Sequence, residues 1–91
     1  MSEPAAVEAT ILRLVAERPG RTVGPMDVAR ALGGDHPDGW GPLMPAVRRA
    51  AVRLMKRGEV VILRKGRPVD PDDFRGVYRI AGSGAGNSAS V

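Results

Sequence analysis

The chain has 91 residues, with 14 Lys and Arg against 10 Asp and Glu, a formal net charge of +4, and no cysteine. This length corresponds to one small domain, and the lack of cysteine excludes disulfides and thiolate metal sites. No apolar stretch approaches the ~20 residues of a membrane span and the N-terminus lacks a secretory-signal pattern, so we expect a cytoplasmic protein.

A first helix is predicted over residues 4–17. Val7, Ile11 and Leu14 follow the i, i+4, i+7 spacing of a single buried stripe. After this helix, Arg21–Val23 forms a short extended link. Because the link is short and contains β-branched residues, it could pair as an edge strand.

A second helix is predicted to begin at Gly24-Pro25 and to run to Leu32, where Gly33-Gly34 stops it. Residues 33–42, GGDHPDGWGP, are rich in turn-forming Gly, Pro and Asp, which predicts a loop longer than that of a tight helix-turn-helix. Trp40, the only tryptophan, lies just before the next helix. Its expected role is an apolar staple onto that helix rather than a ligand contact.

The third helix is predicted from Pro42 or Leu43 to Arg57, with Gly58 as its C-terminal stop. At 100° per residue its apolar side chains gather on one side, while Val52 points outward without an evident reason. We expect the first two helices to hold the third in place through a shared set of apolar residues. These are Val7, Ile11, Leu14, Val28, Leu32, Val47 and Leu54.

Two strand-like segments follow the third helix. Residues 59–64 are β-branched, residues 65–68 form a turn, residues 69–74 make a longer return, and residues 76–80 form a second strand. The order predicts a winged helix-turn-helix: mostly α with a small β-wing (α+β), with three helices plus a two- or three-stranded antiparallel sheet. This domain is expected over residues 1–81, followed by a disordered Gly/Ser/Ala tail over residues 82–91.

The charge is unevenly distributed along the chain. Residues 1–40 carry four basic and six acidic side chains, and residues 41–91 carry ten and four. Between Arg48 and Arg67 there are eight basic side chains and one acid, Glu59. A basic helix beside a basic wing indicates a polyanionic partner reached by one face.

The run from Leu43 to Ile80, LMPAVRRAAVRLMKRGEVVILRKGRPVDPDDFRGVYRI, resembles a family of small bacterial proteins classified as a domain of unknown function. The shared features are the tryptophan before the helix, the V-R-R-A-A core, the R-K-G turn and the V-D-P-x-D-F-R-G segment. The resemblance extends from about Thr10 to Ile80. It implies a winged-helix fold and brings no established reaction, ligand or residue role.

The function predicted from these features is binding of double-stranded DNA, by a small transcriptional regulator or a nucleoid accessory protein. In a winged helix the third helix enters the major groove and the wing follows the backbone. Arg49 and Arg53 are the predicted groove contacts, where a guanidinium can pair with guanine. The predicted backbone contacts are Lys56, Arg64, Lys65 and Arg67. Neutralising about five phosphates would give a log-affinity against log-salt slope near −4 to −5.

Two alternatives stay open. The cationic face could simply be solvated, with Arg48 bordering the core and Arg57 capping the helix. The fold could also serve as a protein–protein interaction module without DNA binding, which outward-facing Val52 and the edge residues Met44 and Met55 favour. A protein partner or a homodimer is possible, and a DNA regulator of this size would gain most from dimerising, since a monomer would read only a half-site.

No enzymatic site is expected. His36 is the only histidine and has no serine near it in sequence. The acids Asp70, Asp72 and Asp73 lack the spacing of a calcium loop, and we expect one of them to pair with Arg75 or Arg67 and fix the wing. No glycine pattern matches a phosphate-binding loop. Neither metal, cofactor, small-molecule ligand nor membrane partner is predicted.

Overall fold

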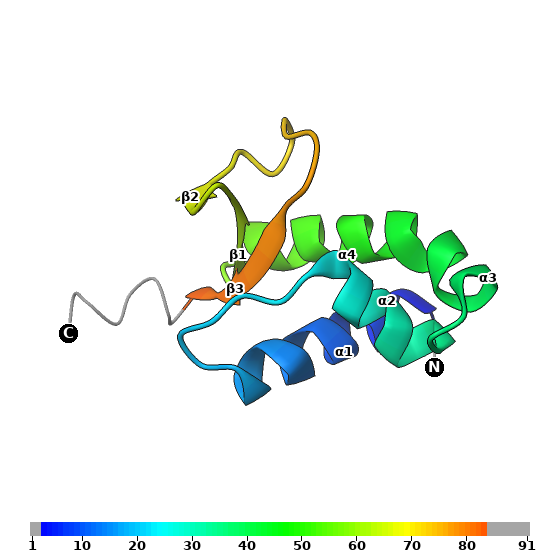
Figure 1. Cartoon of the computed structure of the whole chain (residues 1–91). Coiled ribbons are helices and arrows are strands. Elements are labelled where there is room, and N and C mark those ends of the chain that lie inside the picture. Colours follow the sequence, from blue (N-terminus) through cyan, green and yellow to red (C-terminus); the bar gives the residue numbers. More distant parts are fainter. Residues whose placement is uncertain (1–2, 84–91) are drawn as a thin grey trace.

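The computed structural model describes residues 3–83 and packs three long helices against a small antiparallel sheet (Figure 1). The predicted α+β class and winged-helix arrangement are confirmed. The elements, in chain order, are α1 (Glu3–Glu17), α2 (Pro25–Gly33), α3 (Pro37–Trp40), the 3-10 turn η1 (Gly41–Leu43), α4 (Met44–Lys56), β1 (Val60–Arg64), β2 (Arg67–Pro68) and β3 (Arg79–Gly82).

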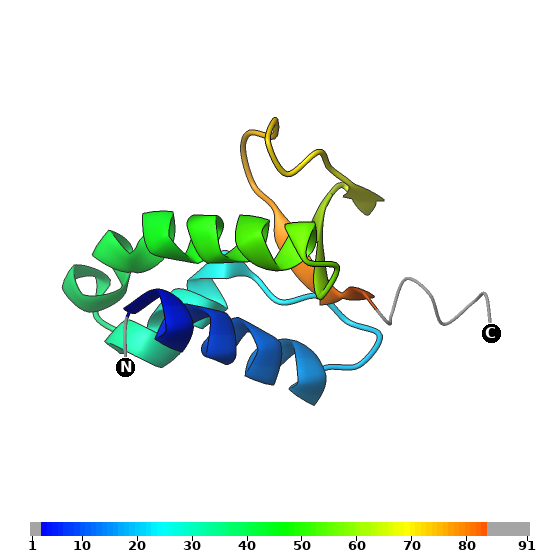
Figure 2. The ribbon, with the colours of Figure 1, turned by 180° about the vertical axis from the view of Figure 1, so that it is seen from behind.

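Helices α1 and α4 lie side by side, with α2 completing the bundle (Figure 2). Each helix turns one apolar stripe inward, because its apolar residues recur at three- and four-residue spacing. All of the predicted core residues are buried except Leu32, which is half-buried. The fully enclosed larger side chains are Val7, Ile11, Val23, Val28, Val47, Leu54, Val60, Ile62 and Ile80.

The sheet has the strand order β2-β1-β3, with all pairs antiparallel. Val60 and Ile62 of β1 face the helices, and Ile62 lies opposite Ile80 of β3. On the other edge of β3, Val23 exchanges both backbone hydrogen bonds with Ile80, at 2.7 and 2.8 Å. This bridge confirms that the Arg21–Val23 link pairs with the sheet edge.

The second strand begins later than the sequence predicts. It starts at Arg79 rather than Gly76 and ends at Gly82. Gly76 has a φ of +83°, a left-handed conformation incompatible with an extended strand. The Val77 carbonyl accepts a hydrogen bond from Arg64 instead of from a neighbouring strand. Of the predicted tail, Gly82 belongs to β3 and the Ser83 amide donates to the Glu59 carbonyl at 3.4 Å, while residues 84–91 lie outside the described residues.

The segment before α4 is helical rather than a simple turn. Pro37 occupies the first turn of α3, and the His36 imidazole Nδ1 accepts a hydrogen bond from the Asp38 amide at 3.2 Å. Gly33 and Gly39 bring α2 and α3 into backbone contact, where a Cβ on either glycine would overlap the carbonyl of the other. This contact, which only glycine permits, has no periodic signature.

Trp40 contacts α2 and the core, while its predicted role as a staple onto α4 stays a prediction. It is half-buried against the core, and its indole N–H donates to the Asp35 carbonyl at 3.2 Å. The Arg30 guanidinium of α2 lies 5.7 Å from its ring centroid. The tryptophan is therefore tied to the end of α2 and to the loop before α3.

The C-terminus of α4 is closed by a Schellman motif. Gly58 has a φ of +80°, its amide donates to Met55, and the Glu59 amide donates to Leu54 at 2.9 Å. The motif turns the chain directly into β1. Gly58 is thus the predicted stop, placed where a left-handed residue is needed.

We call the chain from Arg64 to Tyr78 the wing. Its turn has positive φ at both central residues, Lys65 (53°) and Gly66 (78°), which is the two-residue hairpin that suits the twist of paired strands. Beyond β2 the wing stands over one side of α4 (Figure 1). Phe74 and Tyr78 anchor it in the core, with their rings edge to face at 5.4 Å.

Candidate nucleic-acid interface

Helix α4 and the wing carry all six predicted DNA-contacting side chains. Arg49, Arg53 and Lys56 lie on α4, and Arg64, Lys65 and Arg67 lie on the wing. The buried residues of α4 are Ala46, Val47, Ala50, Ala51 and Leu54, so the opposite stripe faces outward. The decisive question for each cation is whether another protein group already binds it.

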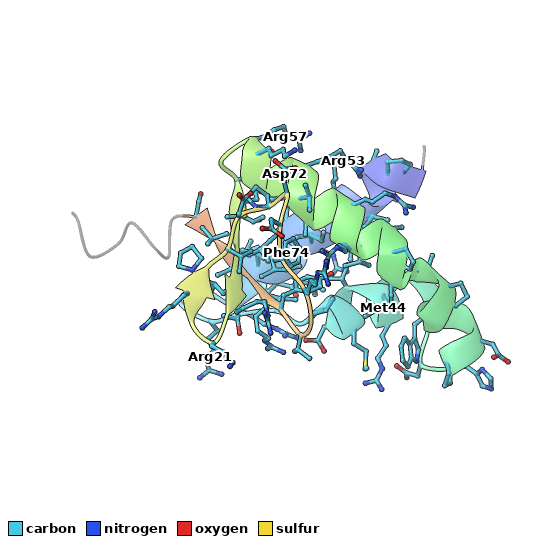
Figure 3. The ribbon with its side chains drawn as sticks, turned by 90° about the horizontal axis from the view of Figure 1, so that it is seen from above. Arg21, Met44, Arg53, Arg57, Asp72 and Phe74 are labelled. Atoms are coloured by element: carbon cyan, nitrogen blue, oxygen red, sulfur yellow. The ribbon has the colours of Figure 1, made fainter. Side chains whose placement is uncertain are left out.

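Arg53 is bound by α1. Its Nε donates to Glu8 Oε2 at 2.6 Å, and Arg57 Nη2 donates to the other oxygen, Oε1, at 2.7 Å. Figure 3 shows both arginines at the C-terminal end of α4. The hydrogen bonds from Arg53 and then Arg57 lower the pKa of Glu8 below its ordinary value, with burial opposing them. Arg53 thus ties α4 to α1, as well as being a predicted groove contact.

Arg57 has a second carboxylate partner, Glu59 Oε2, at 2.9 Å. Hydrogen bonds from Glu8 and then Glu59 raise the pKa of the Arg57 guanidinium. The side chain therefore closes the end of α4 through two acids. This agrees with the structural role that the sequence left open for Arg57.

Lys56 is bound by the wing. Its Nζ lies 2.6 Å from Asp72 Oδ1, and both side chains are exposed. Figure 3 shows Asp72 above the C-terminal end of α4. The wing acids were expected to pair with Arg75 or Arg67, but the pair that forms in residues 3–83 joins Asp72 to Lys56. Asp70 instead accepts the Asp72 amide at 2.9 Å and shapes the local turn.

Arg64 is directed back into the wing. Its Nε donates to the Val77 carbonyl at 3.1 Å, and its guanidinium lies against Gly76, where a Cβ would be 3.0 Å from Nη2. This predicted phosphate contact therefore also fixes the return of the wing. A phosphate would have to compete with the Val77 carbonyl for the same donor.

Arg48 has a structural position. Its guanidinium lies 3.8 Å from the centroid of the Phe74 ring and donates to the Phe74 carbonyl at 2.5 Å. Nearby, burial raises the pKa of Tyr78 to about 12, with the Arg48 charge opposing the shift. The Tyr78 hydroxyl is buried and has no hydrogen-bond partner among the described residues. Arg48 thus fastens the wing to α4.

Val52 also has an explanation. It is half-buried and packs against the core cluster, as do Met44 and Met55. On α4, Val52 follows Arg48 by four residues and precedes Lys56 by four, and both of those residues contact the wing. The outward apolar residue therefore lies on the side of the helix that the wing covers.

Five cations have no hydrogen bond, ion pair or ring contact within the described part of the chain, and all five are exposed. Three belong to the predicted site, and two were missed. They are Arg21, Arg49, Lys65, Arg67 and Arg75.

The two missed cations lie in irregular segments. Arg75 follows Phe74, the residue that Arg48 contacts, so Arg49 and Arg75 each neighbour a member of one helix–wing contact. Arg21 lies in the α1–α2 link and shares a surface groove with Gly66 and Pro68 of the wing. The sequence alone does not single out these two arginines, whereas the tertiary structure shows that neither has a side-chain partner within residues 3–83.

The described residues bring together no group of three or more His, Asp and Glu that could hold a metal ion. His36 serves as the N-cap of α3 and is exposed. Among the described helices, none is both long and apolar enough to cross a membrane.

A comparison with known protein families identifies the family to which the chain belongs. The sequence model of a family described as "Protein of unknown function (DUF3253)" matches residues 4–82, which include all of the described elements except the first residue of α1. No curated protein matches the chain. The match agrees with the resemblance seen in the helix-and-wing motifs. The chain therefore belongs to the DUF3253 family.

Proposed function

We propose that the protein binds double-stranded DNA, with α4 in the major groove and the wing along the adjacent backbone. The observation that carries this proposal is the set of exposed cations on these two elements that have no partner within residues 3–83: Arg49 on α4, and Lys65, Arg67 and Arg75 on the wing. A winged helix presents such residues to DNA. Unpartnered cations can neutralise phosphates without first breaking a contact within the protein.

The roles divide by position. Arg49 projects from the outer stripe of α4 and is the side chain best placed to read a base edge. Lys65 and Arg67 lie at the wing turn and bind phosphate, as does Arg75 beside the helix–wing contact. Arg53, Lys56 and Arg64 act only if DNA displaces Glu8, Asp72 or the Val77 carbonyl.

This division predicts the salt dependence. Three phosphate contacts, from Lys65, Arg67 and Arg75, give a log-affinity against log-salt slope of about −2.7, whereas five contacts give about −4.5. Fluorescence anisotropy of a labelled random duplex across a salt series measures the slope. Salt-independent or absent binding would refute the proposal. A slope near the larger value would mean that Lys56 and Arg64 also exchange their partners for phosphate.

The biological role that fits is a small transcriptional regulator or a nucleoid-associated accessory protein in the cytoplasm. Binding by a single module would be weak, because one recognition helix reads only one half-site. A homodimer on a two-fold site would strengthen it. Sedimentation of the protein with and without duplex DNA distinguishes the two stoichiometries.

A protein–protein interaction module is the second candidate. The observation that favours it is an apolar groove of about 560 Å³ between the start of α2 and the wing. The groove is lined in part by Met26, Met44 and Val77, and Val77 is 83% exposed. If the duplex shows no binding at low salt, Met26→Asp and Val77→Asp variants would test whether this groove mediates self-association or partner capture.

A further inference from the structure

A basic hollow lies on the side of the molecule formed by the α1–α2 link, away from α4. It has a volume of about 610 Å³ and is lined by Arg18, Gly20, Arg21, Thr22 and Arg79. Figure 3 shows Arg21 on the sheet side, remote from the α4 arginines. Three of its five lining residues are arginines, and the proposed DNA-binding face uses none of them.

Arg79 is held rigidly at the wall of this hollow. Its Nε donates to Thr22 Oγ1 at 3.0 Å and its Nη2 donates to the Thr22 carbonyl at 3.2 Å. Its Nη1 lies against Gly24, where a Cβ would be only 2.7 Å away. Because Thr22 Oγ1 accepts from Arg79, the hydroxyl proton remains available for another acceptor. The site thus offers a fixed guanidinium and an oriented hydroxyl.

Within residues 3–83, the positive charge of the hollow is only partly balanced by a carboxylate. Of the three arginines, Arg18 is the one with a carboxylate contact in the described part of the chain: Asp27 Oδ2 accepts from Arg18 at 3.3 Å and from the Gly24 amide at 3.1 Å. Arg21 has no partner among the described residues. Among the described residues, one of the three guanidinium groups therefore has a carboxylate partner, while Arg79 is bound by the uncharged Thr22. Like charges gathered in one hollow favour the binding of a multivalent anion.

We propose that this hollow binds a phosphate group. Phosphate offers several acceptor oxygens and up to two negative charges, which match forked guanidinium donors and a hydroxyl. The phosphate is either that of a free phosphate ester or that of a nucleic-acid backbone. The second source is within reach because Arg21 also lines the groove that contains Gly66 and Pro68 of the wing. The site does not depend on DNA binding by α4.

The first experiment uses inorganic phosphate and pyrophosphate as probes. Amide chemical shifts of the full chain are followed during titration at constant ionic strength, with chloride as the reference anion. We expect saturable shifts at Thr22 and Gly24, and an affinity about tenfold weaker in Arg21→Gln, which removes an unpartnered charge. Thr22→Val, which keeps the shape and removes the hydroxyl, should also weaken binding.

The matched control is Arg13→Gln. Arg13 is an exposed arginine on α1, paired with Glu17 and absent from the lining of the hollow, so this variant loses the same net charge elsewhere. Phosphate affinity should stay within about twofold of wild type in Arg13→Gln, because long-range surface charge is screened. Thermal unfolding of each variant verifies that the fold is kept.

A second arm identifies the source of the phosphate. If Arg21→Gln weakens both pyrophosphate and duplex DNA binding more than Arg13→Gln does, the hollow takes a backbone phosphate. If it weakens only pyrophosphate binding, the ligand is a free phosphate ester. The proposal is overturned if wild type shows no saturable shifts and Arg21→Gln affects DNA no more than the control. If variants of Arg49 and the wing turn show that these residues do not bind duplex DNA, the proposed phosphate site is unaffected, because it is measured with pyrophosphate.

Discussion

The cations of α4 and those of the wing turn differ in what already binds them. Within α4 and its cap, only Arg49 lacks a partner among the described residues, whereas the turn leaves both Lys65 and Arg67 free. The helix is packed on both flanks, by α1 through Glu8 and by the wing through Asp72, so its long side chains find acceptors. The turn projects from the sheet edge, and its residues meet solvent.

A high density of basic residues therefore does not mean that all of them are available to bind a ligand. Eight basic residues lie between Arg48 and Arg67, but five of them bind protein groups. Those five fasten α4 to its neighbours and fix the wing. The remaining three form the surface on which the proposed function depends.

The largest expected effect on stability comes from disturbing the close α2–α3 contact that precedes α4. Gly39→Ala places a methyl group against the Gly33 carbonyl and should lower the free energy of unfolding by about 3 kcal/mol, because backbone must move. Chemical denaturation measures this change. The matched control is Gly41→Ala, since Gly41 is right-handed helical and a methyl group added there would have nothing within 4 Å. Equal stability of the two variants would contradict the close α2–α3 contact.

Removing the available charges should abolish most of the DNA affinity. The triple variant Arg49→Ala, Lys65→Ala, Arg67→Ala should bind duplex about 1,000-fold more weakly at low salt, if each contact contributes about 1.4 kcal/mol. Its melting temperature should stay near that of wild type, because none of the three has a partner in residues 3–83. Anisotropy measures the affinity. A loss of less than threefold would assign the DNA-binding role to other residues.

The partnered charges should behave in the opposite way. Glu8→Gln removes the acceptor of Arg53 and Arg57 and should lower the free energy of unfolding by about 1 kcal/mol at pH 7. Because the folded-state pKa of Glu8 lies below its ordinary value of 4.5, its contribution is present above that pH and is lost as pH falls through the folded pKa. Melting curves of wild type and variant should therefore converge in acid. A difference that persisted in strong acid would mean that the ion pairs are not its cause.

The sequence predicts the helices, the strand pairing and the core well, because these depend on local periodicity and on glycine and proline stops. The class of fold follows from their order. The α3 turn was missed because the Gly33–Gly39 contact joins two backbones and leaves no hydrophobic pattern. The start of β3 was misplaced because β-branched Val77 favours a strand, while Gly76 and Arg64 hold the chain out of one.

The sequence predicts which side of α4 carries the candidate site residues, but not which of these residues already bind other protein groups. Periodicity puts Arg49, Arg53 and Lys56 outside the core, and this is where they lie. It could not show that Glu8, 45 residues earlier, accepts from Arg53. Pairing between distant elements depends on tertiary packing, and the residue pattern along one helix does not predict it. Arg75 and Arg21 escaped notice for the same reason.

The contact between Lys56 and Asp72 offers the finest test of the difference between bound and available charge. Asp72→Asn removes the carboxylate that holds Lys56 and takes one negative charge from the wing. The pair is exposed, so the free energy of unfolding should change by less than about 0.5 kcal/mol. Duplex affinity should rise about threefold, with a salt slope steeper by about 0.9, because Lys56 becomes free to neutralise a phosphate.

The control for this variant is Asp73→Asn, which removes the same charge from the wing at a carboxylate with no ion pair among the described residues. It should raise affinity through the general field alone, without steepening the slope. If both variants steepen the slope equally, Lys56 makes no phosphate contact when it is freed. The pairing with Asp72 would then hold the wing in place without limiting the charge that α4 presents to DNA.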